Sequence, residues 1–180
     1  TGGDRNGEFG ACAMNDPVND SVNNSKRTVN AEVKTSRKPK ISQNRRKSRE
    51  LVLKAVYRAM INTGEIKQII LDAQEDPEYI KADKVYFKSL LAGVTGKMSE
   101  LDNQISTFID RKLEELSPVE HAILRISSFE LMFDMSIPYR VAINEGVELA
   151  KLYGGVDGHK YINGVLDKVA ASARPQEFRR

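Results

Sequence analysis

The sequence is poor in the residues that build disulfides and metal centres. Cys12 is the only cysteine, and His121 and His159 are the only histidines, among 180 residues. One cysteine cannot form an internal disulfide, and neither histidine has a second ligand at helical spacing. We therefore expect no disulfide, which is typical of a protein from a reducing compartment. We also expect no metal site and no cofactor. His121 is interpreted as a solvated pair with Glu120.

Long apolar runs are missing as well. No run approaches the roughly 18 residues needed to cross a bilayer, and the first residues lack the apolar core of a secretory signal. No segment shows the alternation and turn residues of a sheet. The expectation is a cytoplasmic protein without membrane contact, built from helices.

Positive charge is concentrated in the first third of the chain. Residues 1–49 carry 11 Lys or Arg against 5 Asp or Glu, whereas residues 50–180 carry 17 against 20. Between Lys34 and Arg49 there are eight basic residues and no acidic one. Such a block commonly meets a polyanion, although a disordered tail that only aids solubility would have the same composition.

The basic block runs without a linker into an amphipathic helix, in the stretch NRRKSRELVLKAVYR at 44–58. Apolar residues recur at helical spacing from Leu51 to Met60, and Lys47 shares one flank with Lys54 and Arg58. A helix would hold these cations in fixed positions, which reduces the entropy lost on binding. We predict that this stretch binds nucleic acid through Arg45, Arg46, Lys47, Arg49 and Lys54, and we name the first four the basic arm.

Short helices with brief connections account for most of the remaining sequence. Residues 1–42 are interpreted as a disordered basic tail, 43–175 as a helical domain and 176–180 as a C-terminal tail. Six or seven helices predict a compact all-α bundle. After the first helix, which should end near Asn62, Thr63 and Gly64, apolar stripes are expected at Ile66, Ile69 and Ile70; Tyr86, Phe87, Leu90, Leu91 and Val94; Leu101, Ile105, Phe108 and Ile109; Val119, Ala122, Ile123, Ile126 and Phe129; Ile143, Val147 and Ala150; and Ile162, Val165, Leu166 and Val169.

Capping residues mark where helices start and stop. The sequence SPVE combines Ser117 as cap, Pro118 at the first helical position and Glu120, whose carboxylate can reach back to the cap. Gly154–Gly155 is expected to end a helix, and Asp157 to cap the last one.

No stretch carries the pattern of an active site. GVTGK at 93–97 has two residues between its glycines where a phosphate-binding loop needs four, so Gly93 is interpreted as a close helix contact. Glu145 and Glu148 lie three residues apart, but no nucleophile, metal ligand or glycine-rich pocket accompanies them. Structural hydrogen bonding or a binding face is favoured for this pair, and we expect no enzyme.

A second candidate for anion binding lies in DGHKYINGVLDK, residues 157–168. His159 and Lys160 fall in the first turn of a helix, where free backbone N–H groups favour anions. Tyr161 could stack on a base, and Asn163 could read a base edge. If this helix packs near the basic arm, the two would form a composite RNA surface.

In order along the chain, RRKSRELVLKAVYR, YFKSLLAGV, LEELSPVEHAILRISSFEL, IPYRVAINEGVELAK and GHKYINGVLDK resemble the NusB family of bacterial transcription antitermination factors. The resemblance covers residues 45 to about 175 and implies an all-α fold of two three-helix bundles packed crosswise. It also implies binding of boxA RNA together with NusE, a small-subunit ribosomal protein. That complex helps RNA polymerase escape termination in ribosomal RNA operons, and it involves no catalysis.

The resemblance also implies roles for single residues. The family's arginine-rich arm falls on Arg45, Arg46, Lys47 and Arg49, and its second RNA-facing patch falls on Asp157, Lys160 and Tyr161. Tyr57 and Glu120 fall where the family meets its ribosomal-protein partner. Tyr57 would also suit the core, because Leu53 lies one turn earlier. Two features depart from the family: Lys47 replaces an arginine and gives up bidentate phosphate contact, and the tail before Arg45 is longer.

Two other functions remain open on the sequence alone. A similar domain begins a ribosomal RNA cytosine methyltransferase, whose methyl-donor domain would have to follow Arg180. A protein-only adaptor would use the basic tail for solubility alone. The exact RNA element, and a homodimer that masks the basic arm, are also left open.

Overall fold

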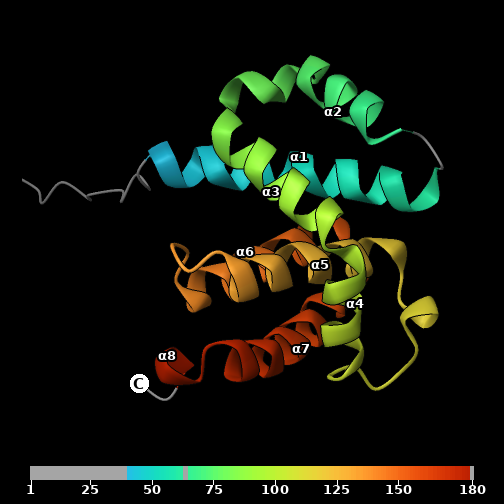
Figure 1. Cartoon of the computed structure of the whole chain (residues 1–180), viewed down its shortest axis with the longest axis vertical. Helices are drawn as coiled ribbons and strands as arrows, with labels where there is room; N and C mark the ends of the chain where they lie inside the picture. The colour runs from blue at the N-terminus through green and yellow to red at the C-terminus, as the bar shows by residue number, and fades with distance from the viewer. Residues whose placement is uncertain (1–39, 63–64, 179–180) are drawn as a thin grey trace, which may run out of the picture. The chain divides into compact units, whose positions relative to one another are not determined.

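The computed structural model describes residues 40–62 and 65–178, which contain helices and no strand (Figure 1). The all-α prediction is confirmed. Two 3-10 helices and the four-residue α8 bring the number of helices above the six or seven expected. The elements are α1 (Lys40–Ile61), α2 (Ile66–Glu75), η1 (Pro77–Lys81), α3 (Lys84–Gly96), α4 (Met98–Ser106), η2 (Leu113–Glu115), α5 (Pro118–Phe133), α6 (Tyr139–Tyr153), α7 (Gly158–Ala173) and α8 (Pro175–Phe178).

Helix α1 is the longest element and ends where the sequence predicted. It has 22 residues and stops at Ile61, directly before Asn62. Thr63 and Gly64, the other predicted stop residues, lie outside the described residues, as do residues 1–39 of the expected tail. Because α1 begins at Lys40, the basic arm lies inside the helix and not in front of it.

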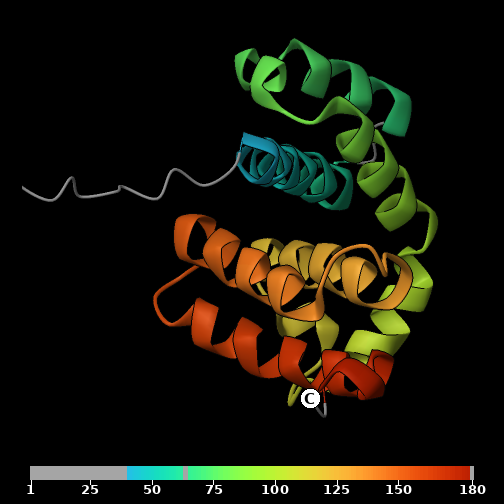
Figure 2. The same ribbon diagram turned by 90° about the vertical axis from the view of Figure 1, so that its left-hand side faces the viewer.

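Two groups of helices meet at α1. This helix packs on α2, η1 and α3, and it also packs on α5. In turn α5, α6 and α7 pack on one another, and α4 follows α3 and contacts α5 and α7. Figures 1 and 2, which are perpendicular views, both show α1 between α2 and the α5–α6 pair. This arrangement agrees with the two three-helix bundles that the resemblance implied.

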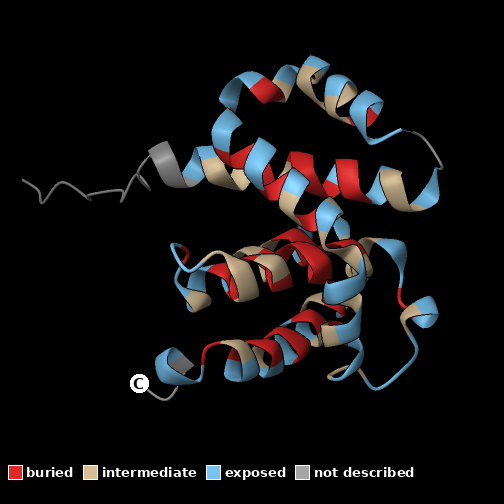
Figure 3. Ribbon diagram, viewed as in Figure 1, coloured by how far each residue is buried: buried red, intermediate tan, exposed pale blue. Residues whose placement is uncertain are grey.

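The predicted apolar stripes form the core (Figure 3). All five stripe residues of α3 and all four of α7 are buried. Each large apolar side chain buried in this way contributes about 1.5–3 kcal/mol. Ile66 is an exception, since it is exposed at the start of α2. Six other stripe residues are only partly buried: Ile70, Phe108, Ile109, Val119, Phe129 and Val147.

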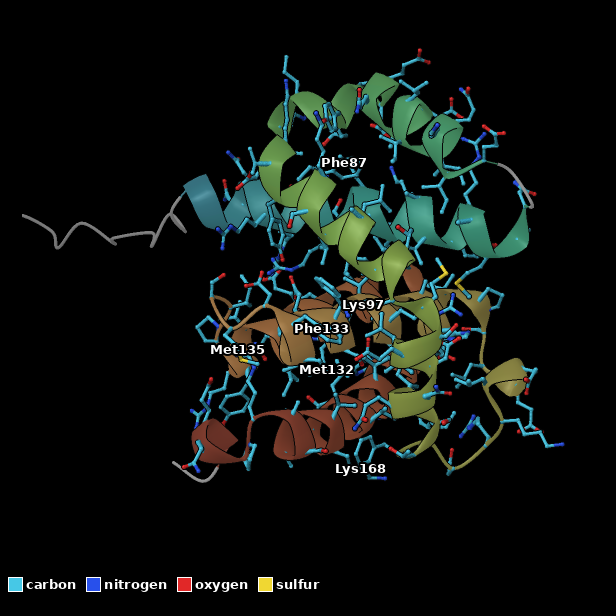
Figure 4. The ribbon with its side chains drawn as sticks, viewed as in Figure 1. Phe87, Lys97, Met132, Phe133, Met135 and Lys168 are labelled. Atoms are coloured by element: carbon cyan, nitrogen blue, oxygen red, sulfur yellow. The ribbon has the colours of Figure 1, made fainter. Side chains whose placement is uncertain are left out.

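The junction of α3 and α4 rests on α5 at two points. A Cβ at Gly93 would overlap the ring of Phe129, which confirms Gly93 as a close helix contact. Lys97, between α3 and α4, places its ammonium 4.2 Å from the ring centroid of Phe133, and the two side chains lie close together in Figure 4. The GVTGK stretch is therefore part of a helix and its packing.

Two capping predictions have different outcomes. Ser117 Oγ accepts a hydrogen bond from the backbone N–H of Glu120 at 3.2 Å, so the predicted cap of α5 is confirmed. Asp157 does precede α7, but it has φ of 65° and makes no capping hydrogen bond. Its carboxylate instead lies 2.7 Å from Lys160 Nζ. Asp tolerates this left-handed backbone, which turns the chain into α7, so the predicted position is right and the predicted capping bond is wrong.

The interpretation of His121 as a solvated pair with Glu120 is wrong. His121 Nε2 lies 2.8 Å from Asp102 Oδ1 on α4, and Arg125 Nη2 lies 2.6 Å from the other oxygen of the same carboxylate. Burial opposes ionisation of Asp102, but hydrogen bonds from Arg125 and His121 prevail and lower its pKa to about 2. This cluster ties α4 to α5.

Arg174 closes the C-terminal end of α5, a role that the sequence did not suggest. Its guanidinium is buried and donates hydrogen bonds to the carbonyls of Glu130, Leu131, Asp134 and Ile137. Carbonyls at a helix end lack partners within the helix, so one buried arginine satisfies several of them. The following α8 (Pro175–Phe178) begins at the last residue of the expected domain and extends into the expected C-terminal tail, 176–180.

Candidate nucleic-acid interface

The basic arm divides into a buried member and three half-buried members. Arg49 is 3% exposed, whereas Arg45, Arg46 and Lys47 keep part of their surface in water. Their helix packs on α3 and α5, so the position of each cation around the helix decides whether it faces the solvent. The arm is therefore one edge of a packed helix.

Arg49 anchors α1 to the second group of helices. Its Nε donates to Glu130 Oε1 at 2.8 Å, and its Nη1 lies 3.6 Å from Glu145 Oε2. Burial raises the pKa of Glu130 to about 7, although the charge of Arg49 acts in the opposite direction. Because the guanidinium faces the interior, Arg49 holds the arm in position in this structure. Direct RNA contact by Arg49 stays a prediction, and the low exposure of this residue does not support it.

Arg46 makes a bidentate pair with Glu145 at the rim of the same cluster. Its Nε and Nη2 lie 3.1 and 2.9 Å from the two carboxylate oxygens. These hydrogen bonds raise the pKa of Arg46. Structural hydrogen bonding was one of the two roles predicted for Glu145, and the geometry confirms it. Arg45 instead contacts the start of α3, with its guanidinium 4.9 Å from the ring centroid of Tyr86 and its Nε 3.7 Å from Asp83 Oδ2.

The predicted cationic flank of α1 exists and faces acidic side chains of the α2–η1 segment. Lys47 Nζ lies 2.6 Å from Glu50 and 3.2 Å from Glu78. Lys54 Nζ lies 3.3 Å from Asp76, and Arg58 pairs with Asp72. The pairs of Lys54 and Arg58 are exposed, and such pairs are worth about 0–1 kcal/mol each, so a phosphate group can replace their carboxylates at little cost.

A second cationic cluster surrounds the start of α7. Lys160 is 72% exposed, and Tyr161 is half-buried with its hydroxyl 3.2 Å from Asp110 Oδ1. The guanidinium of Arg111 lies over the Tyr161 ring, 4.4 Å from its centroid. A cavity of about 280 Å³ is lined by Phe108, Asp110, Lys160, Tyr161, Gly164, Val165 and Lys168. Sequence reasoning missed Arg111 and Lys168, because only the fold brings them to Tyr161.

The two residues assigned to a protein partner both reach the surface. Tyr57 is 38% exposed, which argues against the alternative that it belongs to the core, whereas Leu53 is buried. Glu120 lies against the start of α7: a Cβ at Gly158 would be 2.7 Å from Glu120 Oε1. The predicted partner residue Glu120 and the predicted RNA residue Asp157 therefore lie at the same corner of the molecule.

Neither a metal centre nor a membrane span is found in the part of the chain that the structure describes. No group of three or more histidine, cysteine and carboxylate residues there could hold a metal ion. No described helix is long and apolar enough to cross a bilayer.

The helix groups, the cationic flank of α1 and the Lys160–Tyr161 cluster define a small all-helical protein with surfaces suited to a polyanion. The chain belongs to the NusB family, which it matches over residues 46–171.

Individual relatives agree with this assignment. Transcription antitermination protein NusB of Methylobacillus flagellatus is 58% identical over 142 residues, which cover 79% of this chain and 92% of that protein. The structure of T. maritima NusB is 30% identical with a TM-score of 0.66, covering 76% of this chain and 97% of that one. A crystal structure of NusB and NusE in complex with double-stranded RNA has a TM-score of 0.64 at 24% identity, and the match covers 72% of this chain and 97% of that one. At this identity the similarity shows the fold alone.

Proposed function

We propose that the protein is a transcription antitermination factor that binds boxA-type RNA together with the ribosomal protein NusE, as part of an RNA polymerase complex in the cytoplasm. The observation that carries the proposal is the 58% identity to an antitermination protein over 92% of that protein's length. The proposed role requires binding and positioning, and no catalytic step.

The surface chemistry supports this role. Arg46, Lys47 and Lys54 place three partly exposed cations along one helix, at positions set by packing and by ion pairs. Lys160 and Tyr161 add a cation and an aromatic ring beside a cavity. Cations that meet phosphates and rings that stack on bases are the groups from which single-stranded RNA sites are built. Tyr57 and Glu120 are proposed to contact NusE.

The two alternatives are supported less well. A methyltransferase would use this fold as one domain of a larger protein, whereas the Methylobacillus relative, 92% of which this chain covers, is named an antitermination protein. A protein-only adaptor would not need the exposed Lys160 or the cation-lined Tyr161 cavity. A specific RNA complex would separate the adaptor from the proposal.

The test is the affinity of the full chain for a boxA-type RNA oligonucleotide and for a scrambled RNA of the same composition. Both are measured by fluorescence anisotropy in one buffer, because the phosphate contribution depends on salt concentration. Tighter binding of boxA RNA is the expected result, since base contacts discriminate where phosphate contacts do not. Equal affinity for the two RNAs, with and without NusE, would overturn the proposal.

A further inference from the structure

Tyr153 is an exposed aromatic residue that none of the roles above explains. It is the last residue of α6 and is 39% exposed. Its hydroxyl lies 3.4 Å from Glu50 Oε2, the same carboxylate oxygen that lies 2.6 Å from Lys47 Nζ. An aromatic ring on α6 is thereby joined to the cationic flank of α1.

The hydroxyl of Tyr153 is a neutral donor in its contact with Glu50. Partial burial and the negative charge of Glu50 raise the pKa of Tyr153, so the phenol stays protonated at neutral pH. At 3.4 Å this hydrogen bond is long, so it favours the observed orientation of the ring without fixing it. A ring needed only for the core would not keep this much surface in water.

The position of Tyr153 in the chain places it close to the second cationic cluster. Only residues 154–157 separate it from Gly158, the first residue of α7, so the two backbones are at most about 18 Å apart. Lys160 lies in the first turn of α7. On one side the ring is linked to Lys47 through Glu50, and on the other it lies no more than about 18 Å of backbone from the start of the helix that carries Lys160.

We propose that Tyr153 is a stacking platform for a base of single-stranded RNA that runs from the cationic flank of α1 to the Lys160–Tyr161 cluster. The phosphates before and after this base meet Lys47 or Lys54 on one side and Lys160 on the other. Any base has a π-face, so the platform tightens binding without selecting a sequence. The inference rests on the proposed RNA binding and adds a residue that links the two predicted patches into one track.

Three substitutions separate stacking from other roles of this side chain. Tyr153→Leu keeps apolar bulk and removes the ring, and Tyr153→Phe keeps the ring and removes the hydrogen bond to Glu50. Leu152→Ala is the matched control, because Leu152 is adjacent, apolar and 63% exposed. Circular dichroism of each variant confirms that the helices remain.

The probe is boxA-type RNA in which 2-aminopurine replaces one base at a time, since its emission is quenched by stacking. With the parent protein, quenching is expected at the base that stacks on Tyr161 and, separately, at the base assigned to Tyr153. Tyr153→Leu should remove the second of these signals and reduce affinity by roughly 5- to 150-fold, the range of one base–aromatic stack. The salt dependence should not change, because no phosphate contact is lost. Tyr153→Phe should keep the quenching, and Leu152→Ala should bind as the parent does.

The outcomes distinguish this inference from the function on which it rests. If the parent binds boxA RNA and Tyr153→Leu binds equally well with unchanged quenching, the platform is wrong and the proposed function stands. If Tyr153→Phe loses as much affinity as Tyr153→Leu, the hydrogen bond matters and stacking does not. If Tyr153→Leu weakens only the complex with NusE, the ring is a protein contact. If the parent does not bind RNA, the proposed function and the inference fail together.

Discussion

Charge alone does not decide which residues of the basic arm can meet RNA. Arg46 and Arg49 both approach Glu145, but Arg46 is half-buried at the rim, and Arg49 is buried against Glu130. Arg46 keeps 31% of its side-chain surface in water, so a phosphate can approach it, and Glu145 would still have Arg49 3.6 Å away. Moving Arg49 would leave Glu130 buried without its partner, which is costly. Burial thus separates a residue proposed for RNA contact from one that holds the helix in place.

The first prediction concerns Arg46. Arg46→Ala should weaken boxA binding and reduce the slope of log affinity against log salt by about one, because one phosphate contact is lost. The control is Arg140→Ala, an exposed arginine on α6 outside both predicted patches. Anisotropy titrations over a series of salt concentrations give both quantities. An unchanged slope in Arg46→Ala would remove this residue from the RNA surface.

The second prediction concerns Asp102 and pH. Its pKa is lowered to about 2 in the folded protein, from an ordinary value of 3.8. The group therefore adds stability that is fully present above about pH 4 and is lost as the pH falls toward 2, on the order of 1 kcal/mol after screening by solvent. Urea unfolding at several pH values should show that loss, and Asp102→Asn should lack this part of the pH dependence. Identical pH profiles for the two proteins would contradict the assignment.

At the scale of the element, α5 shows how a local signal and a distant one define a single helix. Its start is set by Ser117 and Pro118, two residues that are adjacent in the sequence. Its end is closed by Arg174, which lies 37 to 44 residues away from the carbonyls that it contacts. Local signals could be predicted from the sequence, and the distant one could not.

The third prediction tests the local signal. Ser117→Ala should lower the free energy of unfolding by about 1 kcal/mol, because the N–H of Glu120 loses its acceptor. RNA affinity should not change at temperatures where the protein is folded, since Ser117 lies outside the proposed contacts. Chemical denaturation followed by circular dichroism measures the difference. Unaltered stability would mean that the cap contributes nothing to α5.

The same distinction explains which parts of the site could be predicted. Periodicity identified the helices, because burial of one face dictates the spacing of apolar residues. It also identified the flank of Lys47 and Lys54, because residues on one helix have fixed relative positions. The ion pairs of Arg49 and His121 join residues of different helices, and nothing in a local pattern specifies them. Arg111 and Tyr153 were missed for that reason.

At the scale of the whole molecule, the described helices contain the predicted core without residues 1–39. The fourth prediction is that deletion of these residues leaves the helical signal and the thermal midpoint unchanged, because α1 begins at Lys40. RNA affinity should fall modestly, since Lys34, Arg37 and Lys38 are lost with the tail. A cooperative loss of helix on truncation would show that the tail is needed for folding.

The fifth prediction separates the two binding surfaces. Glu120→Lys reverses a charge that a basic ribosomal protein would meet, and Tyr57→Ala removes an exposed aromatic contact. Both variants should weaken the complex with NusE while RNA binding by the isolated protein stays the same or rises slightly for Glu120→Lys. Calorimetric titration with NusE measures the first effect. If both folded variants bind NusE as tightly as the parent, the proposed partner surface is wrong.

The central claim is that the protein joins a specific RNA and NusE in one complex, and the most direct measurement is the affinity for boxA RNA with and without NusE. The comparison uses scrambled RNA in the same buffer, so that the phosphate contribution is held constant. The account predicts that NusE tightens binding of boxA RNA more than binding of scrambled RNA, because the two ligands are coupled through one protein. Equal affinity for both RNAs in the presence of NusE, or no effect of NusE on either, would contradict it.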